Sequence, residues 1–396
     1  MLRTCLTIIW MCCVISASAQ TELIKLQDKL IGLSPDPAVR DVSPEQASSI
    51  REFWRIFKDI RDAEIELDRL TGTALFGFNG NTSEDQEIFK INGGITLTKG
   101  SYPYELEFST SLNILIDNGK LQENLSNLRI SYDRFLELKG DPFLLEGYAF
   151  INRRSDQFLG VNQRYEIGAG LILAFWQKRL FDDSQARYDR YATKKLTFNS
   201  MQDNVVICDV EKCVPIALPG IDTSDFDVLH STQQRIANAV IRKRSPMRIG
   251  LLVGPFLEVE SISFSDSLLT QNGMQFVKED FATTNHFRWE VRPTFDVRLS
   301  ERAIIRARPY FKLPMPWEWK IDVAGERVVD YRIEAPIILE VMLSSQFSIR
   351  IDYTIYYDHA PNSALQAVPG PFGAPLYLTA NQRHEVFNFQ VGYTFN

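Results

Sequence analysis

Alternating basic and acidic side chains between residues 288 and 352 are the groups in this sequence best suited to chemistry. They occupy every second position of several segments and give ten candidate lining residues: Arg288, Glu290, Arg292, Asp296, Arg306, Arg308, Arg332, Glu334, Arg350 and Asp352. In a β-strand, every second side chain lies on the same face. The pattern therefore predicts a charged face, which either lines a path for ions and polar solutes or is filled by charges that pair with one another.

The residues between these charges are apolar, and the same period of two continues to the end of the chain. At 383–395, five aromatic or aliphatic residues alternate with polar ones. Strands of about 10 to 15 residues with one apolar face are typical of transmembrane barrels, whereas strands of a soluble sandwich are usually about 5 or 6 residues long. We expect twelve strands, near 72–80, 87–99, 103–117, 123–137, 142–153, 160–177, 247–264, 284–299, 302–320, 329–343, 346–358 and 383–395.

The segment from Lys178 to Pro246 interrupts this series and is too long for a turn. It is either a small insert at about 178–246 or a hidden hairpin, because 192–199 and 204–216 are β-prone. The hairpin would raise the strand count to fourteen. Residues 232–242 have the pattern of a short helix. Cys208 and Cys213 are a candidate disulfide, with a zinc site or free thiols as alternatives.

The N-terminal part has two different patterns. Residues 1–19 resemble a secretion signal, with Arg3, an apolar run from Leu6 to Ile15 and small residues before Gln20. Residues 20–70 have helical spacing, with a helix start predicted at Ser43-Pro44. The apolar face of this helix is expected to pack on the base of the barrel or cap its opening. The alternative is a helix that binds a periplasmic partner or forms a coiled coil. The barrel, with its insert, is expected to occupy 71–396.

Connection lengths predict the orientation of the barrel. After a cleaved signal the chain enters from the periplasm, which places the short connections at 99–102, 138–141, 300–301 and 344–345 on the periplasmic side. The long connections at 265–283 and 359–382 then lie outside the cell, as is usual for outer-membrane barrels. The N-terminus, the C-terminus and the insert are therefore expected in the periplasm.

Residues 125–176 resemble the family of salt-induced outer-membrane proteins, a domain family of unknown function. The likeness lies in Arg129-Ile130-Ser131-Tyr132-Asp133-Arg134-Phe135-Leu136 and in Arg164-Tyr165-Glu166-Ile167-Gly168-Ala169-Gly170-Leu171. It implies an outer-membrane β-barrel and no reaction. The ending Gly392-Tyr393-Thr394-Phe395 is similar to the signal that the barrel-assembly machinery recognises, although Asn396 departs from it.

Catalytic and nucleic-acid functions are not predicted. The four histidines, His230, His286, His359 and His384, lack the sequence frame of barrel phospholipases, which need a serine beside an oriented histidine. The net charge of −7 gives no basic surface for nucleic acid. We expect no enzyme, no cofactor and no metal.

The sequence therefore predicts an all-β protein: a transmembrane antiparallel barrel of the outer membrane, with an N-terminal periplasmic helix. Passive movement of small polar or charged solutes is the expected function. The arginine excess at 288–308 would favour anions. A non-conducting structural or adhesion barrel is the alternative, and a lipid-modifying hydrolase is the second alternative. The expected partners are outer-membrane lipid, the barrel-assembly machinery and a periplasmic protein at the N-terminal helix.

Overall fold

The fold was analysed in a computed structural model. It describes residues 44–82, 87–100, 104–117, 120–136, 143–156, 161–177, 179–192, 195–199, 204–208, 213–217, 223–262, 284–315, 320–321, 327–359, 363–365, 377–379 and 383–395. The expected signal at 1–19 lies outside these residues. The chain divides into two compact units: a helical unit within 1–69, 100–103 and 179–244, and a barrel unit formed by the remainder. Each unit is described by itself.

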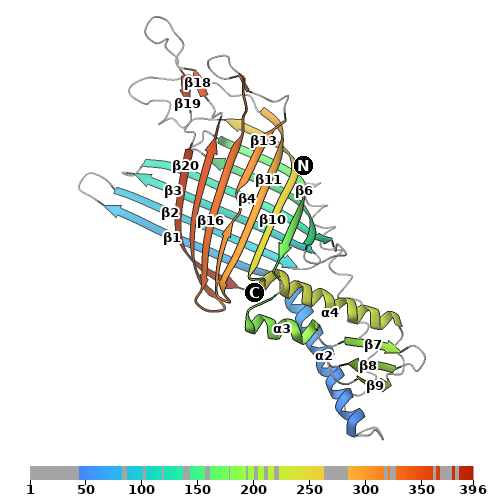
Figure 1. The fold of residues 1–396 in the computed structure, drawn as a ribbon. Coiled ribbons are helices and arrows are strands. Elements are labelled where there is room, and N and C mark those ends of the chain that lie inside the picture. Colours follow the sequence, from blue (N-terminus) through green and yellow to red (C-terminus); the bar gives the residue numbers. More distant parts are fainter. Residues whose placement is uncertain are drawn as a thin grey trace, which may run out of the picture. The chain divides into compact units, whose positions relative to one another are not determined.

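The barrel unit is a closed antiparallel sheet of twelve strands (Figure 1). Its strands are β1 (Thr71–Thr82), β2 (Glu87–Gly100), β3 (Tyr104–Asp117), β4 (Lys120–Leu136), β5 (Phe143–Asp156), β6 (Val161–Trp176), β10 (Met247–Ile262), β11 (Thr284–Ser300), β12 (Ala303–Ala307) with β13 (Tyr310–Pro314), β16 (Arg332–Met342), β17 (Phe347–Asp358) and β20 (Arg383–Phe395). Each strand pairs with its neighbour in the chain, except that β6 pairs with β10 across the insert. The ring closes where β1 pairs with β20, from Gly72 opposite Phe395 to Phe76 opposite Val391.

The strands β12 and β13 are two halves of one barrel strand. Both halves pair with β11 and with β16, and the pairing register is the same on either side of the break. Pro309 lies at the break and has no backbone N–H to donate to the ladder. The strand expected at 302–320 is therefore interrupted, and its described part ends at Pro314.

Exposure shows which face of each strand lies outside. The apolar residues of β20 and β11 are exposed, among them Phe387, Phe389, Phe287 and Trp289. The polar residues between them are buried. Alternation thus gives an apolar outer surface and a polar inner face, which encloses the lumen. The two-stranded sheets β14 (Lys320–Ile321) with β15 (Arg327–Val328), and β18 (Ser363–Leu365) with β19 (Tyr377–Thr379), are separate from the barrel.

The helical unit combines the N-terminal helix with the insert, which were predicted as separate elements. It contains α2 (Pro44–Asp68), α3 (Asp182–Ala192), α4 (Thr223–Arg244) and a sheet of β7 (Lys195–Asn199), β8 (Asn204–Cys208) and β9 (Cys213–Ala217). Since β7–β9 form a sheet of their own, the fourteen-stranded alternative is wrong. The helix predicted at 232–242 corresponds to only the second half of α4.

A small apolar core holds the helical unit together. Ile56, Phe57 and Ile60 of α2 are buried, and Ile236 of α4 is buried as well. Contacts run from α2 to α4 and β9, and from α3 to α4. Of the described residues, none forms a helix both long and apolar enough to cross a membrane.

One ion pair joins α2 to α4 inside this unit. Arg235 of α4 contacts Glu64 of α2, whose side chain is buried. Burial lowers the pKa of the Arg235 guanidinium, because its charged form loses hydration. The N-terminal helix is thus bound to the insert by both apolar and charged contacts.

We predict that Gly254→Ala destabilises the barrel, whereas Gly147→Ala does not. A Cβ at Gly254 would lie 2.2 Å from the backbone oxygen of Ala169 on the adjacent strand, whereas at Gly147 the nearest atom is 3.8 Å away. Overpacking of this kind should lower the free energy of unfolding by about 1–3 kcal/mol. The Gly147 variant should change it by less than about 1 kcal/mol. Urea unfolding midpoints in detergent measure both, and equal midpoints would contradict the proposed close approach of β6 and β10.

Candidate functional site: a charged lumen

The ten candidate lining residues all lie on the inner face, but they do not form one site. Arg288 and Arg332 lie toward the ends of β11 and β16 that adjoin the long connections. Glu290 and Arg292 are the next two residues on the same face of β11. Asp296, Arg306, Arg308, Glu340, Arg350 and Asp352 lie toward the short turns at 301–302 and 343–346. The lumen thus has charged groups at three levels.

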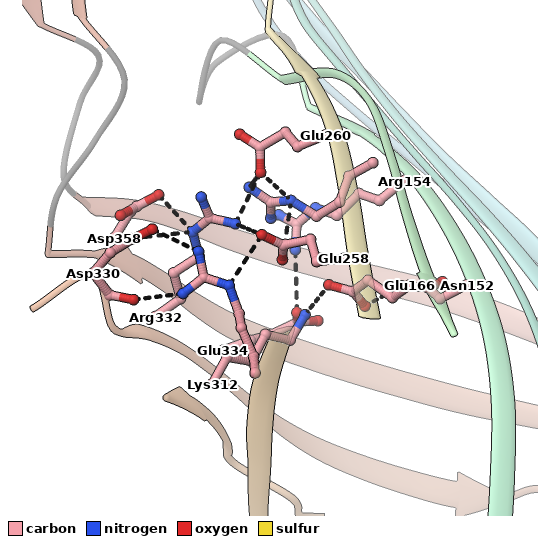
Figure 2. A network of polar contacts seen from close by, with 12 residues as sticks. Asn152, Arg154, Glu166, Glu258, Glu260, Lys312, Asp330, Arg332, Glu334 and Asp358 are labelled. Atoms are coloured by element: carbon pink, nitrogen blue, oxygen red, sulfur yellow. Dashed lines mark hydrogen bonds and ion pairs between the residues drawn. The ribbon is translucent and has the colours of Figure 1, made fainter. Parts of the chain in front are cut away.

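The first level is a network of buried ion pairs (Figure 2). Glu258 of β10 accepts hydrogen bonds from Arg288 Nε at 3.1 Å and from Arg332 Nη1 at 2.8 Å. The Arg288 and Glu258 side chains are both 0% exposed. Because an unpaired charge out of water is strongly destabilising, these groups must satisfy one another.

Further carboxylates complete the shell around the two arginines. Arg332 donates to Asp358 at 2.9 Å and to Glu260 at 2.9 Å, and Glu260 also accepts from Arg164 at 2.8 Å. Arg288 donates twice to Asp330, to its backbone oxygen at 2.6 Å and to its carboxylate at 2.5 Å. We call the set Arg154, Arg164, Glu166, Glu258, Glu260, Arg288, Lys312, Asp330, Arg332, Glu334 and Asp358 the buried ion-pair network.

Lys312 extends the network to the neighbouring strands. Its ammonium group contacts Glu166 of β6 at 2.5 Å, and Glu166 also accepts from the Asn152 side-chain amide at 3.0 Å. Figure 2 shows these three side chains next to the arginine cluster. Glu166, Glu258 and Glu260 thus each have more than one donor, which favours the ionised form of a carboxylate away from water.

Arg154 crosses the lumen. It extends from β5 to Glu334 on β16, with Nη1 3.1 Å from the carboxylate, and its Cζ lies 4.1 Å from the ring centroid of Tyr356 on β17. In the order of strands around the barrel, β5 and β17 are directly opposite. One side chain thus bridges the barrel at this level.

The second level is a group of arginines and aromatic rings: Arg129, Tyr148, Phe150, Arg292 and Tyr310. Arg129 Cζ lies 4.6 Å from the Phe150 centroid, and Arg292 Cζ lies 4.6 Å from that of Tyr148 and 4.7 Å from that of Tyr310. Arg292 Nη1 donates to the Tyr310 hydroxyl at 3.0 Å, and Arg129 donates to the Tyr148 hydroxyl. Cation–π contacts of this kind stabilise guanidinium groups away from water.

Apolar side chains fill the lumen beside this group. Phe150 and Phe256 face each other with centroids 6.3 Å apart. Gly168 provides the room for them, because a Cβ there would lie 2.6 Å from Phe256 Cβ and 2.7 Å from the Phe150 ring. Glycine at this position therefore allows aromatic packing inside the barrel.

The third level consists of ion pairs that water reaches, which we call the rim pairs. They are Arg306 with Glu340 at 2.7 Å, Arg308 with Asp296 at 2.7 Å and Arg350 with Asp352 at 2.9 Å. Their side chains are 13% to 38% exposed. Since these residues lie on the inner face, the exposure indicates an aqueous space in this end of the lumen.

Neutral residues also lie on the inner face. They include Gly77, Asn92, Asn388 and Gln390 of β1, β2 and β20, and Asn388 and Gln390 pair with Asp352 and Arg350 of β17. The amide oxygens of Asn92 and Asn388 have no hydrogen-bond partner among the described residues.

The predicted arginine excess is largely compensated. Arg288, Arg292, Arg306, Arg308, Arg332 and Arg350 each have a carboxylate within ion-pair distance. Many of the compensating groups lie on β6 and β10, outside the segments that contain the predicted lining residues. Glu166, Glu258 and Glu260 alternate in the same way as the predicted residues, so the same period of two was the signal that could have found them.

Tyr148, Tyr310 and Arg129 were also missed. Their types are common in barrel strands, and nothing in their spacing indicates that β4, β5 and β13 bring them together. Such contacts depend on the closure of the barrel, which the chain order alone does not provide.

The remaining candidate residues stay predictions. His359 stacks on Tyr331 with centroids 4.5 Å apart, and His230 contacts Gln234 of the same helix. The His384 side chain lies outside the described part of the structure. Among the described residues, no group of His, Cys, Asp and Glu has the arrangement of a metal site.

The backbone places Cys208 directly opposite Cys213 at the end of the β8–β9 ladder. Directly opposite residues of antiparallel strands have Cα atoms about 4.5–5.5 Å apart, a separation that a disulfide can bridge. The side chains lie outside the described part, so the disulfide remains a prediction.

Strand pairing therefore defines the protein as a closed twelve-stranded barrel with a charged, partly filled lumen. A scan of family models and a search of curated proteins gave no match. The expected likeness to salt-induced outer-membrane proteins thus stays an expectation.

Solved structures similar to this chain are membrane barrels of different activity. The NanC porin matches with a TM-score of 0.34 and 7% identity over 83% of this chain and 100% of its own. An outer-membrane channel from Pseudomonas putida F1 matches with a TM-score of 0.34 and 7% identity, over 82% and 95%. The outer-membrane protease OmpT of Escherichia coli matches with a TM-score of 0.25 and 9% identity, over 82% and 93%. At these TM-scores nothing is inferred from them, and the fold rests on the strand pairing.

We predict that Glu258→Gln destabilises the barrel much more than Glu385→Gln. Glu258 is the shared acceptor of buried arginines, so its neutralisation leaves guanidinium charge without compensation, at a cost of about 3–5 kcal/mol. Glu385 pairs with Arg383 at the surface, where the side chains are 42% and 61% exposed, and its replacement should cost less than about 1 kcal/mol. Urea unfolding in detergent measures both. Similar losses in the two variants would show that the buried network contributes no special stability.

We predict that Cys208 and Cys213 are oxidised to a disulfide in protein from an oxidising compartment. Alkylation under denaturing conditions, followed by mass spectrometry, should modify neither cysteine until a reductant is added. The Cys208→Ser variant should leave Cys213 open to alkylation without a reductant. Full alkylation of the unreduced native chain would show that both are free thiols.

Proposed function

We propose that the protein is an outer-membrane barrel that conducts small charged or polar solutes through a narrow passage, which the buried ion-pair network closes in this conformation. The apolar outer surface and the closed ring of strands support a location in a membrane. The secretion signal predicted at 1–19 supports the outer membrane. The orientation with both termini in the periplasm belongs to the same proposal.

The observation that carries the proposal is the chemical nature of the closure. A barrel that only needs to be closed can be filled with apolar side chains, which is often as stable as burying ion pairs or more so. Here the closing side chains are instead charged, with Arg288 and Glu258 both 0% exposed. Polar groups that pair with one another can also exchange their partners for water. A lumen closed by paired charges can therefore open when water replaces the partners in the buried ion-pair network.

The rim pairs support the same function. They give one end of the lumen a water-accessible lining that contains both positive and negative charges, as expected for a passage that admits small ions and polar molecules. Because the charges are balanced there, we expect weak selectivity between anions and cations from this end. The anion preference expected from the sequence is therefore not supported by the rim pairs.

A non-conducting structural barrel is the second candidate. The specific observation in its favour is the extent of the closure, because Arg154 bridges the lumen between opposite walls while Phe150 and Phe256 fill the space beside it. If the network never opens, the barrel is a scaffold. The two candidates differ in one measurable property, the conductance.

We predict that Arg154→Ala increases conductance in planar bilayers. The substitution removes the side chain that crosses the lumen, so the open probability or the unitary conductance should rise at least severalfold above that of the native protein. Arg134→Ala is the matched control: it removes the same charge on the outer face of β4 and should leave conductance unchanged.

Folding of each variant is verified by its heat-modifiable migration on gels. Discrete native currents that increase in the Arg154 variant would support the gated channel. Silence of both folded proteins would refute it and favour the structural barrel. An equal increase in the Arg134 control would show that the effect does not depend on the position of Arg154 across the lumen.

A further inference from the structure

Arg129 differs from the other arginines of the charged lumen. The guanidinium groups described above each have a carboxylate within ion-pair distance. Arg129 has none among the described residues: its contacts are the Tyr148 hydroxyl and the rings of Tyr148, Phe150 and Tyr310. Its side chain is half-buried on the inner face of β4. Arg129 therefore brings a positive charge into the lumen without a counterion of its own.

A second guanidinium lies close to the first. Arg292 and Arg129 contact the same two tyrosines, with Arg292 Cζ 4.7 Å and Arg129 Cζ 5.7 Å from the Tyr310 centroid. Among the residues that the structure describes, the one carboxylate at this level within ion-pair distance is Glu290, 3.5 Å from Arg292 Nε. Two cations thus share one anion, and a further anion would reduce the repulsion between their like charges.

The hydroxyl groups nearby can act as donors. Tyr310 accepts a hydrogen bond from Arg292 Nη1 at 3.0 Å, and Tyr148 accepts one from Arg129. Each phenol then still has its own O–H to donate. Two guanidinium groups and two phenols therefore offer donors at one level, and Glu290 is the one acceptor carboxylate identified there.

This group lies next to the rim pairs along the lumen. Arg129 is on β4 and Tyr310 on β13, nearly opposite in the order of strands, so the group spans the barrel between the rim pairs and the buried ion-pair network. A solute that passes the rim pairs meets it next.

We propose that Arg129, Arg292, Tyr148 and Tyr310 form a binding site for a small oxyanion, either a carboxylate or a phosphate group. The planar fork of a guanidinium matches the paired oxygens of both groups. The site rests on the proposed function, since the anion reaches it through the lumen, and it would give the passage an internal preference for anions that the balanced rim pairs lack.

Isothermal titration of the refolded full-length protein with inorganic phosphate and with acetate tests this site. Ionic strength is held constant with chloride, and folding is verified by heat-modifiable migration. Arg129→Gln should weaken binding by roughly 10- to 100-fold, the range for loss of a hydrogen bond between charged partners. Arg350→Gln is the control, because it also removes a lumen charge, but one that pairs with Asp352; its affinity should equal the native value.

Binding of either probe, lost in the Arg129 variant and kept in the Arg350 variant, supports the site, and the probe that binds identifies the anion. Native protein that is folded and binds neither probe overturns the proposal. So does an equal loss in both variants, which would indicate a general positive potential in the lumen. Conductance is scored separately: a barrel that conducts but binds neither anion retains the channel and loses only this site.

Discussion

A guanidinium group out of water must have acceptors at hydrogen-bond distance, and the inner face of this barrel depends on that requirement. Arg288 and Arg332 are surrounded by carboxylates from β10, from the residues before β16 and from β17. These acceptors come from strands that the barrel brings together. Glu258 and Arg288 lie on paired strands, and so do Arg332 and Asp358, whereas the contact of Arg154 with Glu334 crosses the lumen. Neutralisation of the arginines therefore depends first on strand pairing and then on the curvature that brings non-adjacent strands together.

The period-two alternation was enough to predict most of the barrel. Few folds of soluble proteins contain long strands with one apolar face. The observed bounds of β20, Arg383–Phe395, equal the predicted ones. The insert was less predictable, because short β-prone runs are compatible both with extra barrel strands and with a separate sheet. Only tertiary contacts distinguish these cases, and α4 and α2 provide them.

The site was predicted in kind but not in arrangement. The sequence indicates that Arg288, Arg292 and Arg306 share a face, and the structure places them on the inner face at three different levels. Glu258 lies on the strand that pairs with that of Arg288, so the predicted strand order could have indicated this contact. The contact of Arg154 with Glu334 across the lumen could not be predicted, since it depends on strand order and tilt together. Tyr148 of β5, which contacts Arg292 of the non-adjacent strand β11, was missed for this reason.

The composition of the helical unit has a consequence for assembly. Its core joins α2, which precedes β1, to α4, which follows β6 and ends at Arg244. The chain between them, with all strands from β1 to β6, is therefore a closed loop once this unit has formed. Closing that loop in advance removes part of the chain entropy that these strands would otherwise lose on entering the sheet. Because α4 follows β6 in the chain, the helical unit can form only after the residues of β1 to β6 have been synthesised, and it then links the two ends of this half of the barrel.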